Sequence, residues 1–361
     1  MSDILVIGGG IIGLLTAREL VQGGAAVTLI EMGRTGRESS WAGGGIVSPL
    51  YPWRYPDAVT ALVRWSQQVY PDLCAALHEA SGIDPEFTPN GLLILDTEER
   101  AQALAWAARQ GDEVQVIEGP AVRALEPELG LRPSQALRFP AVANVRNPRL
   151  AKAARRALDG YLRLREQEEV LDILVAHGHI QGVRTTQGVI HADQVIVCAG
   201  AWTGRLLSQF CRPPAIAPVR GQMILFQARP GQVRHTTLYR DRYVIPRRDG
   251  RVLVGSTLEH TGFVKATTAE ARDALHRSAI ELFPLLEQAP METHWSGLRP
   301  GAPSGIPYIG AYPGTTGLYV NAGHYRNGVV TAPASARLAA DLLLGRVPSI
   351  DPAPYALEAP R

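Results

Sequence analysis

Apolar residues near the start of the chain form two short runs that flank a glycine-rich turn and a helical stretch. The first run covers residues 4–7, and the second covers residues 27–30 and ends at Glu31. Between them, apolar positions recur at helical spacing beyond Gly13 and stop at Gly23. This order predicts a strand, a turn, a helix and a second strand with an acidic residue at its end.

The middle of the chain continues with alternating helical and strand patterns. The predicted helices cover residues 57–80 (interrupted at Pro71), 96–110 and 147–160, and the predicted strands cover residues 91–95, 170–175, 180–185 and 195–197. We expect Asp96, with Glu99 three residues later, to cap the second helix. Asn147 is expected to cap the third helix, and Gly160 to end it.

The last third of the chain has a different pattern. Residues 222–226, 242–246 and 251–255 predict antiparallel strands around a turn at residues 248–250. Residues 195–197, by contrast, are apolar without alternation, which is typical of a strand buried on both faces of a parallel sheet. A strand over residues 318–322 leads into a helix ending near Leu344, and residues 348–361 are expected to extend over the surface.

Together these elements predict an α/β fold of two domains. One is a Rossmann-like domain with a mostly parallel sheet, and the other is an α+β domain built on an antiparallel sheet. A chain of 361 residues is long enough for both.

Composition narrows the function classes. The net charge of +2, with basic and acidic residues interspersed, does not indicate a nucleic-acid-binding surface or attraction to an anionic membrane. No run is apolar enough to span a membrane, and no basic segment or cleavage pattern marks a secretory signal. Cys74, Cys198 and Cys211 form no disulfide framework, which favours a reducing, cytoplasmic setting. The histidines lack metal-ligand spacing, so we expect no metal.

The first turn has the spacing of a dinucleotide-binding motif. Gly8 permits a tight turn, Gly10 lets the backbone approach a pyrophosphate, and Gly13 lets the helix pack closely on the strand. The helix N-terminus then offers N–H groups and a positive dipole end to phosphates. Glu31 is placed to accept hydrogen bonds from ribose hydroxyls, which argues against a 2′-phosphorylated cofactor.

Residues 35–52 are rich in glycine and serine, with Ser39, Ser40, Gly44 and Gly45 among them. Such a stretch is either a plain linker or a loop in contact with a cofactor. We favour contact, because glycines let backbone amides approach a ligand.

Six segments, taken in their order along the chain, resemble the motifs of a known family. They are residues 8–31, residues 39–45, Cys198-Ala199-Gly200-Ala201-Trp202, Tyr243-Val244-Ile245-Pro246-Arg247, Gly297-Leu298-Arg299-Pro300 and Gly323-His324-Tyr325-Arg326-Asn327-Gly328. Together they resemble the D-amino-acid oxidase family of FAD enzymes, and most closely the bacterial glycine oxidases of thiamine biosynthesis. The resemblance runs from about residue 3 to about residue 345.

The resemblance implies a non-covalently bound FAD. Its expected binding residues are Gly8, Gly10, Ile11, Ile12, Gly13, Glu31, Met32, Ser39, Ser40, Gly44, Gly45, Ile46, Val170, Ala199, Gly200, Trp202, His324, Tyr325, Arg326, Asn327, Gly328 and Val329. The FAD-binding domain is expected to comprise residues 1–80, 141–218 and 296–361, and the substrate-binding domain residues 81–140 and 219–295.

The substrate implied by the resemblance is a small amino acid. Arg299, expected in a loop, would hold its carboxylate bidentately, and Tyr243 would share it through the hydroxyl. Arg326 would be either a second cation beside the substrate or part of a salt bridge that fixes the C-terminal loop. His324 is expected to make backbone contacts without an acid–base role.

The implied reaction is oxidative deamination. A hydride passes from the substrate Cα to flavin N5, the imine hydrolyses to an α-keto acid or glyoxylate plus ammonia, and O2 is reduced to hydrogen peroxide. A D-amino-acid or sarcosine oxidase or dehydrogenase, and more remotely a tRNA-modifying FAD enzyme, remain alternatives. We also expect a homo-oligomer, although no residue pattern specifies one.

Three segments depart from the family pattern. Arg240-Asp241-Arg242 replaces a stretch that usually carries histidine, residues 51–56 form an aromatic insertion, and Leu258 stands where relatives often have methionine. We expect these segments to alter the size and charge of the substrate pocket.

Overall fold

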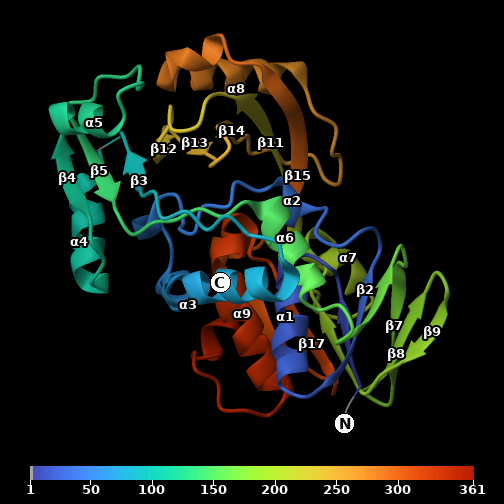
Figure 1. The fold of residues 1–361 in the computed structure, drawn as a ribbon. Coiled ribbons are helices and arrows are strands. Elements are labelled where there is room, and N and C mark those ends of the chain that lie inside the picture. Colours follow the sequence, from blue (N-terminus) through green and yellow to red (C-terminus); the bar gives the residue numbers. More distant parts are fainter. Residues whose placement is uncertain (1–2, 97) are drawn as a thin grey trace.

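The computed structural model describes residues 3–96 and 98–361, and within them it contains sheets of six, eight and three strands (Figure 1). The six-stranded sheet has the order β16 (Tyr308–Ala311), β17 (Leu318–Ala322), β10 (Gln194–Val197), β1 (Asp3–Ile7), β2 (Ala26–Glu31), β6 (Arg163–Glu166). All its pairings are parallel except that of β16 with β17. The prediction of a mostly parallel sheet is therefore confirmed.

This sheet is buried on both faces. Ile4 and Val6 pack against the helices α1 (Ile11–Gln22), α3 (Asp57–Ser81), α6 (Asn147–Arg156) and α9 (Gly328–Leu343). Leu5 and Ile7 face the three-stranded sheet β7 (Val170–Ala176), β8 (His179–Thr185) and β9 (Gly188–His191). Burial on both faces explains why the strands are apolar without alternation.

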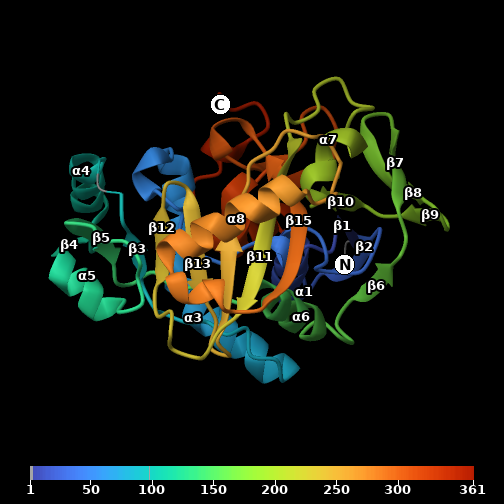
Figure 2. The ribbon, with the colours of Figure 1, turned by 90° about the horizontal axis from the view of Figure 1, so that it is seen from above.

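The eight-stranded sheet has the order β15 (Met291–Gly301), β11 (Ala217–Gln227), β14 (Arg251–Gly255), β13 (Arg242–Pro246), β12 (Thr236–Tyr239), β3 (Leu92–Ile94), β5 (Gln135–Phe139), β4 (Gln115–Glu118). Only the β12–β3 pairing is parallel. Helix α8 (Ala269–Leu282) lies across β11 on one face (Figure 2). Neither α8 nor β15 was predicted from the sequence.

The remaining elements are short. They are the helices α2 (Ser39–Ala42), α4 (Arg100–Gln110), α5 (Gly119–Leu125) and α7 (Thr203–Leu206), and 3₁₀ turns at Pro52–Arg54, Gly200–Trp202, Pro284–Glu287, Pro303–Gly305, Tyr325–Asn327 and Ala353–Tyr355. No helix within the described residues is long and apolar enough to cross a membrane.

Two helix predictions were wrong because tertiary contacts override local signals. Helix α3 continues through Pro71, since buried residues on both sides of it, including Tyr70 and Cys74, hold the helix against the core. Helix α4 begins only at Arg100. The Asp96 carboxylate accepts a hydrogen bond from the Tyr51 hydroxyl (2.8 Å), and Glu99 accepts from Trp53 and Arg54.

Helix α6 also differs from its prediction. Arg146 is its N-cap, and Asn147 occupies the first helical position with its side chain against Gly43 and Gly45. The helix ends at Arg156, and Gly160 lies in the turns that follow.

The C-terminal segment is not simply extended over the surface, as was expected. Tyr355 is buried, and its hydroxyl donates to the Ala58 carbonyl at 2.7 Å. The end of the chain is thereby tied to α3.

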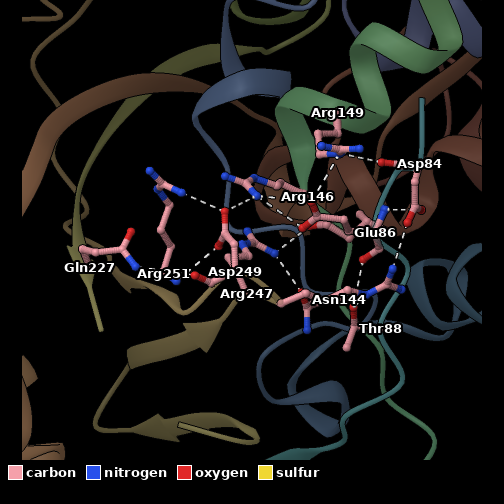
Figure 3. A network of polar contacts seen from close by, with 12 residues as sticks. Asp84, Glu86, Thr88, Asn144, Arg146, Arg149, Gln227, Arg247, Asp249 and Arg251 are labelled. Atoms are coloured by element: carbon pink, nitrogen blue, oxygen red, sulfur yellow. Dashed lines mark hydrogen bonds and ion pairs between the residues drawn. The ribbon is translucent and has the colours of Figure 1, made fainter. Parts of the chain in front are cut away.

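A polar network joins the eight-stranded sheet to the loop before β3 and to the start of α6 (Figure 3). Arg146 donates to Glu86 at 3.2 Å and to Asp249 at 2.8 Å. Arg247, at the end of β13, points toward Asn144 and donates to its Oδ1 at 2.7 Å. These contacts fix the antiparallel sheet over the edge of the parallel one.

Candidate functional site

A cavity of about 440 Å³ lies where the two large sheets meet. Its walls come from the first glycine turn, the glycine–serine segment, the start of β7, residues 198–208, the eight-stranded sheet and residues 321–329. With one exception, every site residue proposed from the sequence lines it, including Met32, Ile46, Val170, Ala199, Gly200, Trp202, Tyr325 and Val329. The exception is Gly13.

The glycine turn forms one end of the cavity. Gly8 has φ +108°, a conformation that favours glycine. A Cβ at Gly13 would come closer than 3.0 Å to the Gly8 carbonyl oxygen, so Gly13 permits close packing of α1 rather than contact with a ligand. At the start of α1, Ile11 N donates to Ser40 Oγ at 2.8 Å, which places the glycine–serine segment beside the turn.

Glu31 lies at the end of β2 on the cavity wall. Its carboxylate accepts hydrogen bonds from Gly9 N at 2.7 Å and Gly33 N at 2.9 Å. Burial raises the pKa of Glu31, while the two backbone donors oppose that shift. The side chain is a fixed acceptor at the position where the motif requires one.

The N-terminus of α9 forms a second wall. The 3₁₀ turn Tyr325–Asn327 leads directly into this 16-residue helix at Gly328. The helix therefore directs N–H groups and the positive end of its dipole toward the cavity. Within the described residues, two buried donors or acceptors here lack a partner, namely His324 Nε2 and Asn327 Nδ2.

His324 is electrically neutral in the folded protein. It is buried, and burial lowers its pKa to about 3. At neutral pH the imidazole adds no charge to the cavity, and its unpartnered Nε2 is free to hydrogen-bond with a bound group.

Arg299 lies on strand β15, so its expected position in a loop was wrong. Its Nη2 donates to Ser256 Oγ at 2.6 Å, and its Nη1 donates to the Thr257 carbonyl at 3.2 Å. No carboxylate among the described residues pairs with it. A fixed guanidinium without a counter-ion, on the wall of a cavity, is suited to bind a carboxylate.

Tyr243, on β13, lines the same cavity as Arg299. Its ring occupies space left by two glycines, because a Cβ at Gly255 would lie 2.8–2.9 Å from the ring and hydroxyl, and one at Gly44 would lie 3.2 Å from Cε2. Within the described part of the chain the hydroxyl hydrogen-bonds only to Met223 Sδ, at 3.8 Å. Its proton is available to a stronger acceptor.

Arg326 also lines the cavity. Across residues 3–96 and 98–361 it forms no ion pair, so the salt-bridge alternative finds no support. Burial raises the pKa of Tyr55, and the positive charge of Arg326 opposes this shift. The second cation of the site therefore lies on the turn that precedes α9.

Sequence reasoning missed three residues that shape the site. Ser256 and Gly221 contact the Arg299 guanidinium, and Arg247 donates from Nη2 to the Gly44 carbonyl at 2.7 Å. Arg247 is buried, and burial lowers its pKa to about 10. Only the motif around Tyr243 signalled Arg247, and nothing in the sequence linked Ser256 or Gly221 to Arg299.

The three unusual segments lie outside the lining of the cavity. None of residues 51–56, Arg240, Asp241 or Arg242 lines it, and neither does Leu258, which is 46% exposed. Arg242 instead donates to the Ser256 carbonyl. That these segments alter the size and charge of the substrate pocket stays a prediction.

Comparison with known proteins agrees with this geometry. The profile of the FAD dependent oxidoreductase family matches residues 3–342. The chain is 51% identical over 359 residues to a glycine oxidase of Pseudomonas aeruginosa, covering 99% of each. It is 30% identical over 350 residues to the bifunctional protein ThiO/ThiG of Nostoc, covering 95% of this chain and 52% of that one. The crystal structure of glycine oxidase from Geobacillus kaustophilus superposes with a TM-score of 0.94 at 30% identity, over 100% of both chains.

Proposed function

The chain belongs to the family of FAD-dependent oxidoreductases, and from this we propose that it oxidatively deaminates glycine and other small amino acids or amines. One observation carries the choice of substrate. Arg299 and the Tyr243 hydroxyl, both without an acidic partner among the described residues, line the cavity that also contains the glycine turn and the N-terminus of α9. This arrangement suits a small ligand with a carboxylate.

The cavity fits FAD. Gly8 and Gly10 line the cavity at the N-terminus of α1, where a pyrophosphate would bind, Glu31 offers an acceptor for ribose hydroxyls, and His324 and Asn327 hold buried polar atoms without protein partners in the described part of the chain. The N-terminus of α9 would stabilise negative charge on the bound group. When bound, FAD supplies the hydride acceptor for the substrate Cα.

The residues of this chain position the substrate. Arg299 binds the carboxylate bidentately, and the Tyr243 hydroxyl donates a hydrogen bond to the same group. Fixing the carboxylate restricts the orientations of the Cα–H bonds, and positioning of well-oriented groups reaches effective molarities of up to roughly 10⁵ to 10⁸ M. Burial keeps His324 neutral, and we propose that it has no acid–base role and that the substrate amine binds deprotonated. The imine product leaves and hydrolyses to glyoxylate or an α-keto acid plus ammonia.

We further propose several finer properties. FAD is bound non-covalently, since no cysteine follows Cys211. O2 is the electron acceptor and yields hydrogen peroxide, and the enzyme is a cytoplasmic homo-oligomer. Similarity to the ThiO/ThiG protein, with the sequence resemblance, supports a role in thiamine biosynthesis. The division into FAD-binding and substrate-binding domains is also proposed, and its boundary at residue 296 falls within β15 (Met291–Gly301).

Anaerobic addition of glycine, sarcosine and D-alanine to the purified yellow protein tests this function. Bleaching of the visible band by glycine, with recovery and peroxide release in air, is the expected result. Bleaching without recovery in air would indicate a dehydrogenase. A yellow protein that none of the three compounds reduces would contradict the proposed amino-acid chemistry.

A further inference from the structure

Ser256 is the only side chain among the described residues that hydrogen-bonds to the Arg299 guanidinium. It immediately follows β14 and is 6% exposed. Its Oγ accepts from Arg299 Nη2 at 2.6 Å, and it lines the same cavity as Arg299 and Tyr243. The serine therefore contacts both the guanidinium and the space in which the substrate carboxylate would lie.

The hydroxyl proton of Ser256 is not donated to a hydrogen bond within the described residues. A serine hydroxyl donates one hydrogen bond and accepts up to two. Arg299 can only donate, so it uses one acceptor position of Ser256 and leaves the proton free. No described residue accepts that proton in the structure. A buried donor of this kind is costly to leave unpaired, and a carboxylate held on Arg299 would accept from it.

We propose that Ser256 is a specificity-determining residue that holds the Arg299 guanidinium in place and donates its own proton to the substrate carboxylate. The inference rests on the proposed function and deepens it. The carboxylate then receives hydrogen bonds from three side chains, Arg299, Tyr243 and Ser256. Only a ligand group with several acceptor positions can accept hydrogen bonds from all three side chains. The site therefore selects carboxylates over carboxamides and unsubstituted amines.

The fold places Ser256 at this position through non-local pairing. In the sheet, β11 lies between β15, which carries Arg299, and β14, which ends just before Ser256. The Arg299 side chain therefore crosses Gly221 on β11 to reach Ser256, and a glycine leaves room for it to do so. Thr257 contributes its carbonyl to the same guanidinium at 3.2 Å, so consecutive residues hold both of its terminal nitrogens.

The test uses the FAD-loaded protein and the variants Ser256→Ala and Ser256→Thr. Acetate, a carboxylate without an amine, is titrated against the visible spectrum, and kcat and KM are measured with glycine. Ser256→Ala removes one hydrogen bond to a charged group, so we expect it to weaken acetate binding and to raise KM for glycine about tenfold. Its kcat should stay within about twofold. Ser256→Thr keeps the hydroxyl and should restore acetate binding to within about threefold of wild type.

Ser278→Ala is the matched control, because this serine lies on α8 and its hydroxyl donates to the Ala274 carbonyl at 3.0 Å. It should bind acetate as the wild type does. An unchanged acetate affinity in Ser256→Ala, with full FAD content and an unchanged melting temperature, would overturn the inference. So would a wild-type protein that does not bind acetate. Reduction of the wild type by glycine is scored separately, so failure of the proposed function is distinguishable from failure of the role of Ser256.

Discussion

The guanidinium of Arg299 lies directly against Gly221. A Cβ on Gly221 would come closer than 3.0 Å to Nη1, Nη2 and Cζ of Arg299, which real Cβ atoms essentially never do. The two residues sit on paired strands, since Val219 is opposite Arg299 and Gly221 is opposite Gly297. The missing side chain at Gly221 therefore determines where the positive charge of the site lies.

Gly221→Ala should displace Arg299 without unfolding the protein, because the obstructed atoms are the far end of a flexible side chain. We expect kcat/KM for glycine to fall by roughly 10- to 100-fold, as for loss of a bidentate carboxylate contact, and stability to fall by about 1–3 kcal/mol. Steady-state kinetics and thermal unfolding measure the two effects. A variant with wild-type KM would show that the guanidinium does not need this space.

Tyr243→Phe should impair substrate binding while leaving the fold intact. Among the described residues the hydroxyl hydrogen-bonds only to Met223 Sδ, at 3.8 Å, so its loss removes no strong internal hydrogen bond. We expect KM for glycine to rise about tenfold and the melting temperature to stay within about 2 °C. Tyr51→Phe, which removes a hydroxyl bonded to Asp96 outside the cavity, is the control. If Tyr243→Phe kept the wild-type KM, the hydroxyl would have no part in carboxylate binding.

Arg247→Met should destabilise the protein and weaken FAD binding together. Its guanidinium donates to the Gly44 carbonyl, the Val145 carbonyl and Asn144 Oδ1, and its loss leaves buried acceptors without a partner. The expected cost is about 3 kcal/mol, with release of the Gly44 turn from its position on the cavity wall. Denaturant unfolding and FAD titration measure these effects.

Arg248→Met is the matched control for Arg247→Met. The neighbouring arginine is about half exposed and bonds to Asp84 on the surface, so its replacement should cost no more than about 1 kcal/mol. Equal losses of stability and of FAD affinity in the two variants would contradict a special role for Arg247 in fixing the Gly44 turn.

The parts of the fold that were predictable depend on local sequence. The turn between β1 and α1 needs glycines at fixed positions, and burial on both faces leaves β10 without alternation, so both signals lie in consecutive residues. Strand β15 gave no such signal, because its first three residues are exposed and its buried end contains glycines such as Gly297, whose missing Cβ makes room for Ala42. Helix α8 does carry apolar residues at Leu275, Ala279 and Leu282, so its pattern was present in the sequence.

The candidate site was predictable in its residue types and not in its geometry. The resemblance supplied Arg299 and Tyr243 as substrate-binding candidates, and the structure places both on the cavity wall. The contacts that orient them come from pairing of β11 with β14 and β15, which joins residues from 24 positions apart (Gln227 and Arg251) to 84 positions apart (Ala217 and Gly301). No local pattern in the sequence determines that pairing, so Ser256 and Gly221 could not be linked to Arg299 in advance.

The stability of the protein should depend on pH through His324. Burial lowers its folded-state pKa to about 3, whereas in the unfolded chain the imidazole has its ordinary pKa of 6.5. Between these two pH values the unfolded state binds the proton and the folded state does not. The free energy of unfolding is therefore highest above pH 6.5 and decreases as the pH falls below 6.5. At about pH 5 the loss amounts to about 2 kcal/mol.

His324→Asn removes this titrating group and should flatten the pH dependence. Denaturant unfolding at about pH 7.5 and about pH 5 should show a smaller loss in the variant than in wild type, by about 2 kcal/mol. His260→Asn, which replaces an exposed histidine, should behave as wild type. Because His324 lines the cavity, FAD content is measured at both pH values, and the comparison uses samples of equal occupancy. An identical pH dependence in His324→Asn and wild type would mean that the imidazole reaches solvent or a proton acceptor, and that its neutrality does not contribute to the electrostatics of the site.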